Sequence, residues 1–247
     1  MKLLIVIPAR YGSTRFPGKP LVCIGGISLI ERVYRNCSGV KNAQVVVATD
    51  DRRIESHVRE FGGEAMMTSK HHPSGTDRAA EVARRHACDV VINVQGDEPL
   101  LPASVIRRIA DVMLREKKLE MATLAHPITR SQDYQDPNVV KVVLDRDSDA
   151  LYFSRSPIPH LWDAWHSMLG VYRHVGIYAY QRSFLLHYVK WPQSLLEKAE
   201  KLEQLRALDR GIKIHVLKTT YEAIGVDVPS DVKKVERILK GARIRLK

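Results

Sequence analysis

Short apolar runs rich in β-branched residues alternate with amphipathic stretches along the first part of the chain. The runs have the length of buried strands and lie at residues 3–7, 44–48, 65–67 and 89–94. The stretches between them repeat their apolar positions at helical spacing, near residues 28–37, 51–61 and 76–87. Because strands that alternate with helices pair in parallel, this pattern predicts an α/β fold with a mainly parallel sheet.

The second half of the chain is less regular. Strand character recurs at residues 139–144, 150–153, 175–180 and 213–217, and a stretch with Pro, Trp and His separates some of these runs at 154–169. The spacing also predicts one long helix over 194–210, ended by Gly211, and a closing helix from Pro229. We find no internal repeat, and we predict a single domain over residues 1–240 with a substrate-side insertion near 125–190 and a basic tail at 241–247.

The charge balance favours an anionic partner. The chain has 39 Lys and Arg against 28 Asp and Glu, a formal net charge of +11. A nucleic-acid binder would gather these charges in a stripe with aromatic residues, but they are scattered and aromatic residues are 6% of the chain. We therefore expect no nucleic-acid partner, whereas small polyphosphates and acidic sugars remain open.

Cysteine usage and hydropathy indicate the compartment. The three cysteines, Cys23, Cys37 and Cys88, are far apart and form no CxxC pair, so neither a disulfide framework nor a zinc site is expected. No apolar run reaches the length of a membrane span, and no cleavage site follows the first apolar run. We expect a cytoplasmic protein with no membrane association.

A loop with several cations follows the first predicted strand. Residues 8–20 read PARYGSTRFPGKP, in which Arg10, Arg15 and Lys19 are spaced by small and turn-forming residues. Polyphosphates are held by fixed cations and close backbone approach, and a loop at the carboxyl end of a parallel strand supplies both. The loop is therefore a candidate phosphate site, although a surface turn with solvated charges would have a similar composition.

Seven motifs of the chain resemble one known family in their order. They are the loop at 8–20, ATDD at 48–51, SGTD at 74–77, NVQGDEP at 93–99, NVVK at 138–141, YFSRSPIP at 152–159 and LEQLR at 202–206. Together they are similar to the 3-deoxy-manno-octulosonate cytidylyltransferases, the CMP-Kdo synthetases, over residues 3–239. The resemblance implies a Rossmann-like, three-layer nucleotide-diphospho-sugar transferase fold, with the 125–190 insertion also serving dimerisation.

The resemblance also implies a reaction. CTP and 3-deoxy-manno-octulosonate (Kdo) would give CMP-Kdo and pyrophosphate with Mg²⁺, in a homodimer that serves lipopolysaccharide synthesis. No Ser/His/Asp or Cys/His arrangement with the required neighbours is present, so we expect direct attack of the anomeric hydroxyl of Kdo on the α-phosphorus without a covalent intermediate. A cytidylyltransferase for 8-amino-Kdo or a sialic-acid-like sugar, a non-catalytic nucleotide sensor and a nucleic-acid binder are the alternatives.

The first half of the chain would hold CTP and the metal. Arg15 and Lys19 would contact the β- and γ-phosphates, and Asp97 would act with them in catalysis. Asp97 and Asp227 are the predicted Mg²⁺ ligands, since this cation prefers oxygen, and Glu98 is a weaker candidate. A helix N-cap is the alternative role for Asp97. The other predicted CTP contacts are Pro8, Ala9, Arg10, Ser74, Gly75, Thr76 and Gln95.

The sugar contacts are carried over from the family. They are Arg155, His174, Tyr178, Glu203 and Gln204, a guanidinium for the carboxylate of Kdo and polar groups for its hydroxyls. Each of these residues also has an interpretation that needs no ligand. Glu203 and Gln204 lie in the middle of the predicted helix. His174 is typical of a strand edge, and Tyr178 is typical of a core. Capping alone would also explain Ser74.

The chain departs from the family pattern at three places. Val228 stands where the family usually has Thr, and Leu195 stands where it often has Pro. The stretch 161–172 is shorter and more aromatic than usual. We therefore hypothesise that Trp162 and Trp165 belong to a lid over the sugar pocket or to a subunit interface.

Overall fold

The computed structural model describes residues 2–12, 16–163, 165 and 170–245. Contacts between Cα atoms divide the chain into two compact units. The first unit contains the residues up to Arg108 and returns from Ala223 onward, and the second unit is Ile109–Glu222. The second unit thus extends beyond the predicted insertion at 125–190, and the description of the chain as a single domain stays a prediction.

The first unit is built on a parallel sheet. Strand β1 (Leu3–Ala9) pairs in parallel with β4 (Ala43–Thr49) and with β6 (Val90–Asn93), and β4 pairs in parallel with β5 (Ala65–Met67). The four predicted strands and their parallel pairing are confirmed. The apolar side chains of β1 are almost completely buried, as expected for a strand that is covered on both faces.

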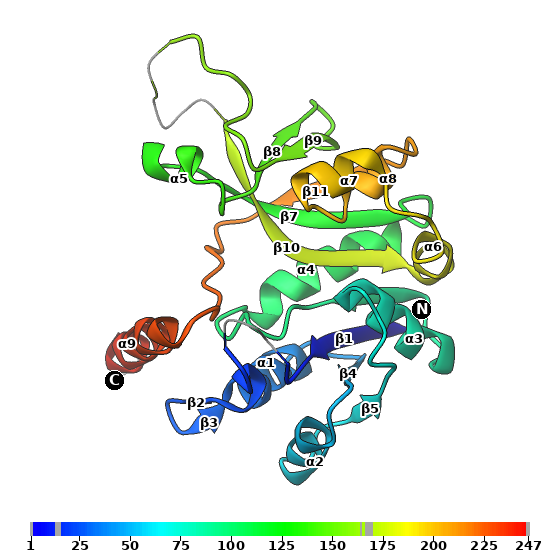
Figure 1. The fold of residues 1–247 in the computed structure, drawn as a ribbon, viewed down its shortest axis with the longest axis vertical. Coiled ribbons are helices and arrows are strands. Elements are labelled where there is room, and N and C mark those ends of the chain that lie inside the picture. The colour runs from blue at the N-terminus through cyan, green and yellow to red at the C-terminus, as the bar shows by residue number, and fades with distance from the viewer. Residues whose placement is uncertain (1, 13–15, 164, 166–169, 246–247) are drawn as a thin grey trace. The chain divides into compact units, whose positions relative to one another are not determined.

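Helices follow the strands of this unit in the predicted order (Figure 1). Helix α1 (Leu29–Ser38) contacts β1 and β4, α2 (Arg52–Glu60) contacts β4 and β5, and α3 (Gly75–Arg85) contacts β1, β4 and β6. Their N-caps are Ser28, Asp51 and Ser74, whose side chains accept hydrogen bonds from backbone N–H groups of the first turn.

The remaining elements of this unit connect or close it. A 3₁₀ turn, η1 (Lys19–Leu21), and a hairpin of β2 (Cys23–Ile24) and β3 (Ile27–Ser28) lie between β1 and α1. Helix α4 (Ala103–Arg115) leads the chain from the first unit into the second, and α9 (Pro229–Arg245) ends the described chain as predicted.

The second unit is built on a mixed sheet. Strand β7 (Met121–Pro127) pairs antiparallel with β10 (Tyr172–Gln181) and parallel with β11 (Ile214–Lys218). Strand β8 (Lys141–Leu144) pairs antiparallel with β10 and with β9 (Ala150–Ser154). Its helices are α5 (Ser131–Gln135), α6 (Arg182–Tyr188), α7 (Leu195–Glu200) and α8 (Leu205–Leu208).

The predicted long helix over 194–210 is wrong. The chain forms α7 and α8 instead, because Lys201 adopts a left-handed conformation with φ of 56° that ends α7. Across the break, the guanidinium of Arg206 donates to both carboxylate oxygens of Glu197, at 2.8 and 2.6 Å, and both side chains are buried. This hydrogen bond with Glu197 raises the pKa of Arg206. A buried ion pair therefore holds the turn closed where a continuous helix was expected.

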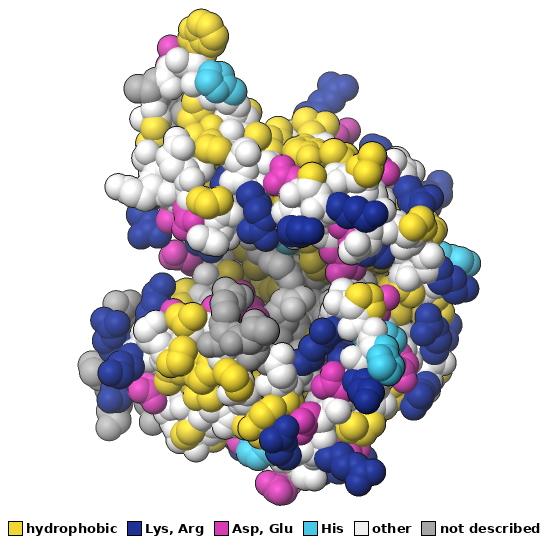
Figure 2. All heavy atoms as spheres, viewed as in Figure 1, with side chains coloured by type: hydrophobic (Ala, Val, Ile, Leu, Met, Phe, Trp, Pro, Cys, Tyr) yellow, Lys and Arg dark blue, Asp and Glu magenta, His cyan; other side chains and the backbone are white. Residues whose placement is uncertain are grey.

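The surface carries its charges without a single dominant patch on the face that Figure 2 shows. Lys and Arg side chains are spread over both units there, among Asp and Glu side chains. No helix among the described residues is both long and apolar enough to cross a membrane. The expectation that the chain binds no nucleic acid stays a prediction.

Two loops at the carboxyl edge of the parallel sheet approach each other closely. A Cβ atom added at Gly96, which follows β6, would lie 2.8 Å from the carbonyl oxygen of Pro8 near the end of β1. Real Cβ atoms do not approach a backbone oxygen so closely, so only glycine fits at this position without a backbone shift. Gly96 thereby lets the loop after β6 lie against the start of the 8–20 loop.

We expect Gly96→Ala to destabilise the protein by about 1–3 kcal/mol, because the added methyl group overpacks against the backbone of Pro8. The measurement is the free energy of unfolding from denaturant titration. Gly241→Ala is the matched control, since open space surrounds that position in α9 and alanine favours a helix by about 0.5–1 kcal/mol. Equal stability of the Gly96→Ala and wild-type proteins would contradict the close-approach argument.

We expect Arg206→Met to cost about 3–5 kcal/mol, because it leaves the buried carboxylate of Glu197 without its cation. Thermal or chemical unfolding measures the loss. The double variant Glu197→Leu with Arg206→Met removes both charges and should recover most of the stability. If the double variant were as unstable as the single one, packing rather than charge pairing would explain the turn.

Candidate active site

Two carboxylates converge on one lysine in the first unit. Gly18 adopts a left-handed conformation with φ of 71° immediately before η1, and Lys19 begins that turn. The Nζ atom of Lys19 lies 2.8 Å from Oδ2 of Asp97 and 3.4 Å from Oδ1 of Asp227. The structure therefore brings together three of the predicted site residues, which come from three distant parts of the sequence.

Backbone contacts place Asp227 beside Asp97. The N–H of Val226 donates to the carbonyl oxygen of Asp97 at 2.9 Å, and Val226 is completely buried. Oδ2 of Asp231, in the first turn of α9, accepts from the N–H groups of Asp227 and Val228 at 2.9 and 3.0 Å. These bonds use the main chain at Val228, so they do not require a threonine hydroxyl at this position.

The alternative that Asp97 is a helix N-cap is not supported. The next helix, α4, begins only at Ala103, and the side chain of Asp97 pairs with Lys19 instead. Its side chain is about one-third exposed, at 32%, so one carboxylate is accessible to a ligand from solvent. Glu98, the weaker candidate, is partly buried in the same loop.

The predicted nucleotide contacts meet at the N-terminus of α3. The Oγ atom of Ser74 accepts from the N–H groups of Thr76 and Asp77 at 3.2 Å, so Ser74 is a helix cap as well as a candidate ligand. A Cβ atom at Gly75 would lie 3.2 Å from Cγ of Pro8, which places Gly75 against the end of β1. Ala9 is buried, and Gln95 is partly exposed after β6.

The 8–20 loop is anchored at both of its described ends. The guanidinium of Arg10 donates to the carbonyl oxygen of His72 at 2.5 Å, and the N–H of Gly18 donates to the carbonyl oxygen of Tyr11 at 2.9 Å. Arg53 of α2 lies 3.3 Å above the centre of the Tyr11 ring, a cation–π contact. Arg15, the other predicted phosphate ligand, lies outside the described residues.

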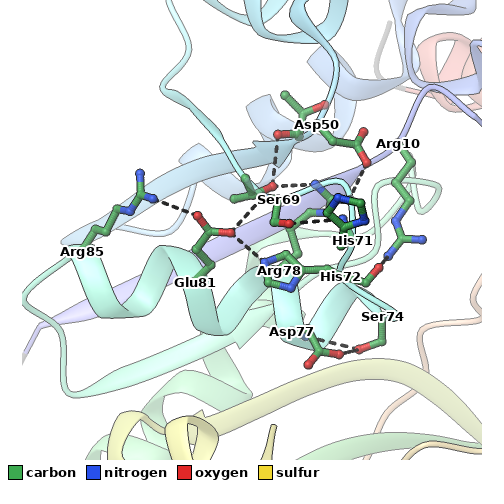
Figure 3. A network of polar contacts seen from close by, with 12 residues as sticks. Arg10, Asp50, Ser69, His71, His72, Ser74, Asp77, Arg78, Glu81 and Arg85 are labelled. Carbon is green, nitrogen blue, oxygen red and sulfur yellow. Dashed lines mark hydrogen bonds and ion pairs between the residues drawn. The ribbon is translucent and has the colours of Figure 1, made fainter. Parts of the chain in front are cut away.

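Sequence reasoning missed a buried arginine that supports this region. Arg78 of α3 is completely buried, and its guanidinium donates to Oδ2 of Asp50 at 2.7 Å and to Oγ1 of Thr68 at 2.5 Å (Figure 3). It thereby ties α3 to the segments that follow β4 and β5. Its position directly after the SGTD motif is the signal that could have identified it.

A second set of contacts in Figure 3 holds the loop before α3. Glu81 accepts from the N–H of Ser69 at 2.9 Å, lies 2.7 Å from Nε2 of His72, and pairs with Arg85 at 2.9 Å. Although burial raises the pKa of the Glu81 carboxyl, its hydrogen bonds with Ser69 and His72 outweigh this and lower the pKa overall. The loop that presents the backbone of His72 to Arg10 is thus fixed from α3.

In the second unit, Arg155 is bound to the main chain. Its Nε donates to the carbonyl oxygen of Glu200 at 2.9 Å, and its Nη1 donates to the carbonyl oxygen of Pro137 at 3.1 Å. The carbonyl oxygen of Arg155 in turn accepts from Nζ of the buried Lys141, which also donates to the carbonyl oxygens of Asp136 and Val139. Arg155 therefore has a well-defined position, with part of its donor set in use.

His174 and Tyr178 lie together on β10. Their ring centres are 5.2 Å apart, and the rings of His174 and Phe153 are nearly perpendicular with their centres 5.1 Å apart. Burial lowers the pKa of His174 to about 3, so its imidazole is uncharged near neutral pH. Burial is also the main reason that the pKa of Tyr178 lies well above its usual value, and the nearby charge of Glu203 adds to this. Both predicted sugar contacts are thus neutral groups.

Glu203 and Gln204 lie in the turn between α7 and α8, so the structural alternative that placed them in the middle of a long helix is wrong. The hydroxyl of Tyr188 donates to the carbonyl oxygen of Glu203 at 2.7 Å and fixes this turn. Gln204 is buried, and its Nε2 has no hydrogen-bond partner among the described residues. An unpartnered buried amide costs stability, which marks Gln204 as a group that a ligand can satisfy.

The stretch proposed as a lid or interface is described only in part. Residues 164 and 166–169 lie outside the described residues. Trp165 packs on Tyr134 with ring centres 5.2 Å apart, beside a cluster of Ile128, Val139 and Val171. Trp162 is 92% exposed. The two tryptophans therefore differ in their surroundings, and the hypothesis of a lid or interface remains a prediction.

Comparisons with known proteins agree with the fold and with the family resemblance. The cytidylyltransferase family model matches residues 4–214. A 3-deoxy-manno-octulosonate cytidylyltransferase of Trichlorobacter lovleyi is 47% identical, with 97% of this chain and 99% of that protein covered. The corresponding protein of Geobacter metallireducens is 48% identical, with 95% and 96% covered.

Solved structures give the same result. A structure of CMP:2-keto-3-deoxy-manno-octonic acid synthetase complexed with CTP has a TM-score of 0.93 at 44% identity and covers 98% of this chain and 100% of that chain. The 4-diphosphocytidyl-2C-methyl-D-erythritol synthase of Anaerococcus prevotii has a TM-score of 0.64 at 14% identity and covers 97% and 98%, which shows the fold alone. The predicted α/β nucleotidyltransferase fold is confirmed, and the chain belongs to the 3-deoxy-manno-octulosonate cytidylyltransferase family.

Proposed function

We propose that this protein transfers CMP from CTP to the anomeric hydroxyl of Kdo and thereby activates Kdo for lipopolysaccharide synthesis. The observation that carries the proposal is the convergence of Asp97, Asp227 and Lys19 beside a cation-bearing loop, in a chain that belongs to this family. The oxygen of the anomeric hydroxyl forms a bond to the α-phosphorus, and the proton of this hydroxyl passes to solvent water. The bond from the α-phosphorus to the bridging oxygen breaks, and pyrophosphate leaves with the electron pair.

The two carboxylates fit a divalent cation. The ammonium of Lys19 lies between Asp97 and Asp227, and this ion pairing supports a cation site there. Among the described residues no group of three or more His, Cys, Asp or Glu side chains forms a metal site. Two carboxylates suit Mg²⁺, which usually keeps several waters and shares substrate phosphates.

We propose that Asp97 and Asp227 hold Mg²⁺ and that Lys19 turns to the phosphates of CTP. Mg²⁺ bound there supplies charge neutralisation for the triphosphate and lowers the pKa of the attacking hydroxyl. Lys19 stabilises negative charge on the departing pyrophosphate, together with Arg15. Arg10 differs from these cations, because its guanidinium already supports the backbone of His72.

The nucleotide and the sugar would use different units. We propose that Pro8, Ala9, Gly75, Thr76 and Gln95 contact CTP, since backbone near Gly75 and Pro8 is closely packed at the carboxyl edge of the sheet. His174, Tyr178, Glu203 and Gln204 would contact hydroxyls of Kdo, and Arg155 would contact its carboxylate. The uncharged His174 and the unpartnered Nε2 of Gln204 support a polyhydroxylated ligand on this side.

We also propose a cytoplasmic homodimer, as the family resemblance implies. The exposed side chains Trp162, Leu151 and Leu195 lie on the second unit, which contains the predicted dimerisation subregion, and they would support association through this unit. Sedimentation velocity of the purified protein measures the subunit number.

The test of the function is pyrophosphate release from CTP with a panel of acceptors. We expect turnover with Kdo and Mg²⁺ and much slower turnover with sialic acid. Faster turnover with 8-amino-Kdo than with Kdo would transfer the assignment to the amino sugar. No turnover with any acceptor, together with CTP binding, would favour a nucleotide sensor and contradict the proposal.

We expect Asp97→Asn to lower kcat by about 100-fold, because a neutral amide weakens the interaction with the cation where charge develops in the transition state. The KM for Kdo should change little. Steady-state kinetics at saturating Mg²⁺ measures both constants. Asp147→Asn, in the exposed turn between β8 and β9, is the control and should retain wild-type kcat. An unchanged kcat for Asp97→Asn would refute the role of Asp97.

A further inference from the structure

A bulge in the sheet of the second unit brings one threonine hydroxyl against His174. Val175 of β10 pairs with Leu124 of β7, but the next pair is Tyr178 with Thr123, so Gly176 and Ile177 have no partner on β7. Thr123 is completely buried opposite this bulge. A bulge of this kind redirects side chains and leaves backbone groups outside the regular ladder.

The Oγ1 atom of Thr123 has three polar neighbours. It lies 2.8 Å from the carbonyl oxygen of Ile177, 3.2 Å from the carbonyl oxygen of Val175 and 2.9 Å from Nε2 of His174. A hydroxyl has a single hydrogen to donate and accepts through its lone pairs. The hydroxyl can therefore donate toward the carbonyls or to the imidazole, but not to both.

The two carbonyl oxygens decide the direction of that hydrogen. A carbonyl oxygen can only accept, so without the hydrogen its lone pairs would face those of the threonine oxygen in a buried site. The hydrogen of Thr123 therefore points to the carbonyls of Ile177 and Val175. The oxygen is then an acceptor for His174, and Nε2 of His174 must carry a hydrogen.

The opposite nitrogen of the ring follows from this assignment. With one hydrogen on a neutral imidazole, Nδ1 of His174 has a lone pair and acts as an acceptor. No described residue supplies a hydrogen-bond partner to Nδ1. The contacts with Phe153 and Tyr178 fix the plane of the ring.

We propose that Thr123 is a positioning residue that fixes the tautomer of His174, so that Nδ1 of His174 accepts a hydrogen bond from a hydroxyl of the sugar. The inference rests on the proposed function, because it takes His174 to be a sugar contact. It adds the direction of the hydrogen bond and the residue that sets this direction.

The assignment determines which part of an acidic sugar His174 recognises. A carboxylate has no hydrogen to donate, so it cannot bond to the lone pair of Nδ1 and would be repelled by it. A hydroxyl donates to Nδ1 without any change in charge. Burial lowers the pKa of His174 to about 3, which keeps the imidazole neutral and preserves this preference near neutral pH. His174 thus favours one orientation of the sugar, with its carboxylate directed elsewhere.

The first test is ¹⁵N NMR of the histidine side chains in the free protein at pH 7, without CTP or sugar. Long-range proton–nitrogen correlations distinguish a protonated from an unprotonated ring nitrogen, and the spectrum of His174→Gln identifies the signals of His174 among the 10 histidines. We expect a protonated Nε2 and an unprotonated Nδ1. An unprotonated Nε2 in the wild-type protein would overturn the proposal, even if the enzyme is active with Kdo.

The second test compares Thr123→Val with Thr123→Ser. Valine keeps the shape of threonine but has no hydroxyl, whereas serine keeps the hydroxyl. In Thr123→Val we expect that Nε2 of His174 is no longer predominantly protonated. We also expect the KM for Kdo to rise about tenfold, the effect of roughly one hydrogen bond. The KM for CTP should remain unchanged, and Thr123→Ser should restore the wild-type tautomer.

A double-mutant cycle separates this effect from loss of stability. In the His174→Gln background, Thr123→Val should have little further effect on the KM for Kdo, since the two residues act through one contact. An equal effect in both backgrounds would show that Thr123 acts through the strand rather than through His174 and would overturn the proposal. Absence of turnover in the wild-type protein would instead contradict the proposed function and leave the NMR result to decide the tautomer.

Discussion

Two like charges must share one cation in the first unit, and the nucleotide side of the site depends on this constraint. Asp97 and Asp227 are held near each other by main-chain bonds, chiefly that from Val226 to the carbonyl of Asp97. The carboxylates cannot move apart without breaking this packing, so their repulsion must be offset by a positive charge. Lys19 supplies it in the free protein. Under the proposed function, a divalent ion held by these carboxylates would take over this role and leave Lys19 to the phosphates of CTP.

In the second unit, buried charges are offset by groups of the unit itself. Its buried ionic groups are already paired, as Arg206 is with Glu197, or surrounded by carbonyl oxygens, as Lys141 is. Three of the proposed sugar contacts are neutral, the imidazole of His174, the phenol of Tyr178 and the amide of Gln204, whereas Arg155 and Glu203 are ionic. Neutral, partly desolvated donors and acceptors suit a sugar, since hydroxyls discriminate by hydrogen-bond direction rather than by charge.

Local patterns predicted much of the first unit because its signals are local. Buried parallel strands give continuous apolar runs, and the caps Ser28 and Ser74 stand at fixed spacing from the turns that they close. Strand β7 escaped prediction because Thr123 and His126 interrupt a run otherwise rich in alanine. The break between α7 and α8 escaped it because Glu197 and Arg206 meet across a turn, at a spacing that no single helix would bring together.

The candidate site shows the same difference between local sequence signals and long-range contacts. The family resemblance placed Lys19, Asp97 and Asp227 in one site, although only Asp97 follows a strand closely, whereas Lys19 begins η1 and Asp227 precedes α9. Arg78 and Thr123 were missed, although Arg78 directly follows the SGTD motif, since the residue type does not reveal which group a buried side chain will contact. Their roles depend on long-range geometry, such as the bulge opposite Thr123, which exists only in the folded chain.

Whether a buried polar side chain already has hydrogen-bond partners distinguishes a supporting residue from a candidate ligand contact. Nζ of Lys141 uses all three of its donors on carbonyl oxygens, and Arg206 is paired with both carboxylate oxygens of Glu197, so the loss of either cation is expected mainly to lower stability. Gln204 is as buried as they are, yet its Nε2 lacks a partner among the described residues. A buried amide without a partner lowers the stability of the fold. Under the proposed function, a hydroxyl of the sugar that bonds to this amide would recover that free energy, so the affinity for the sugar would depend in part on Gln204.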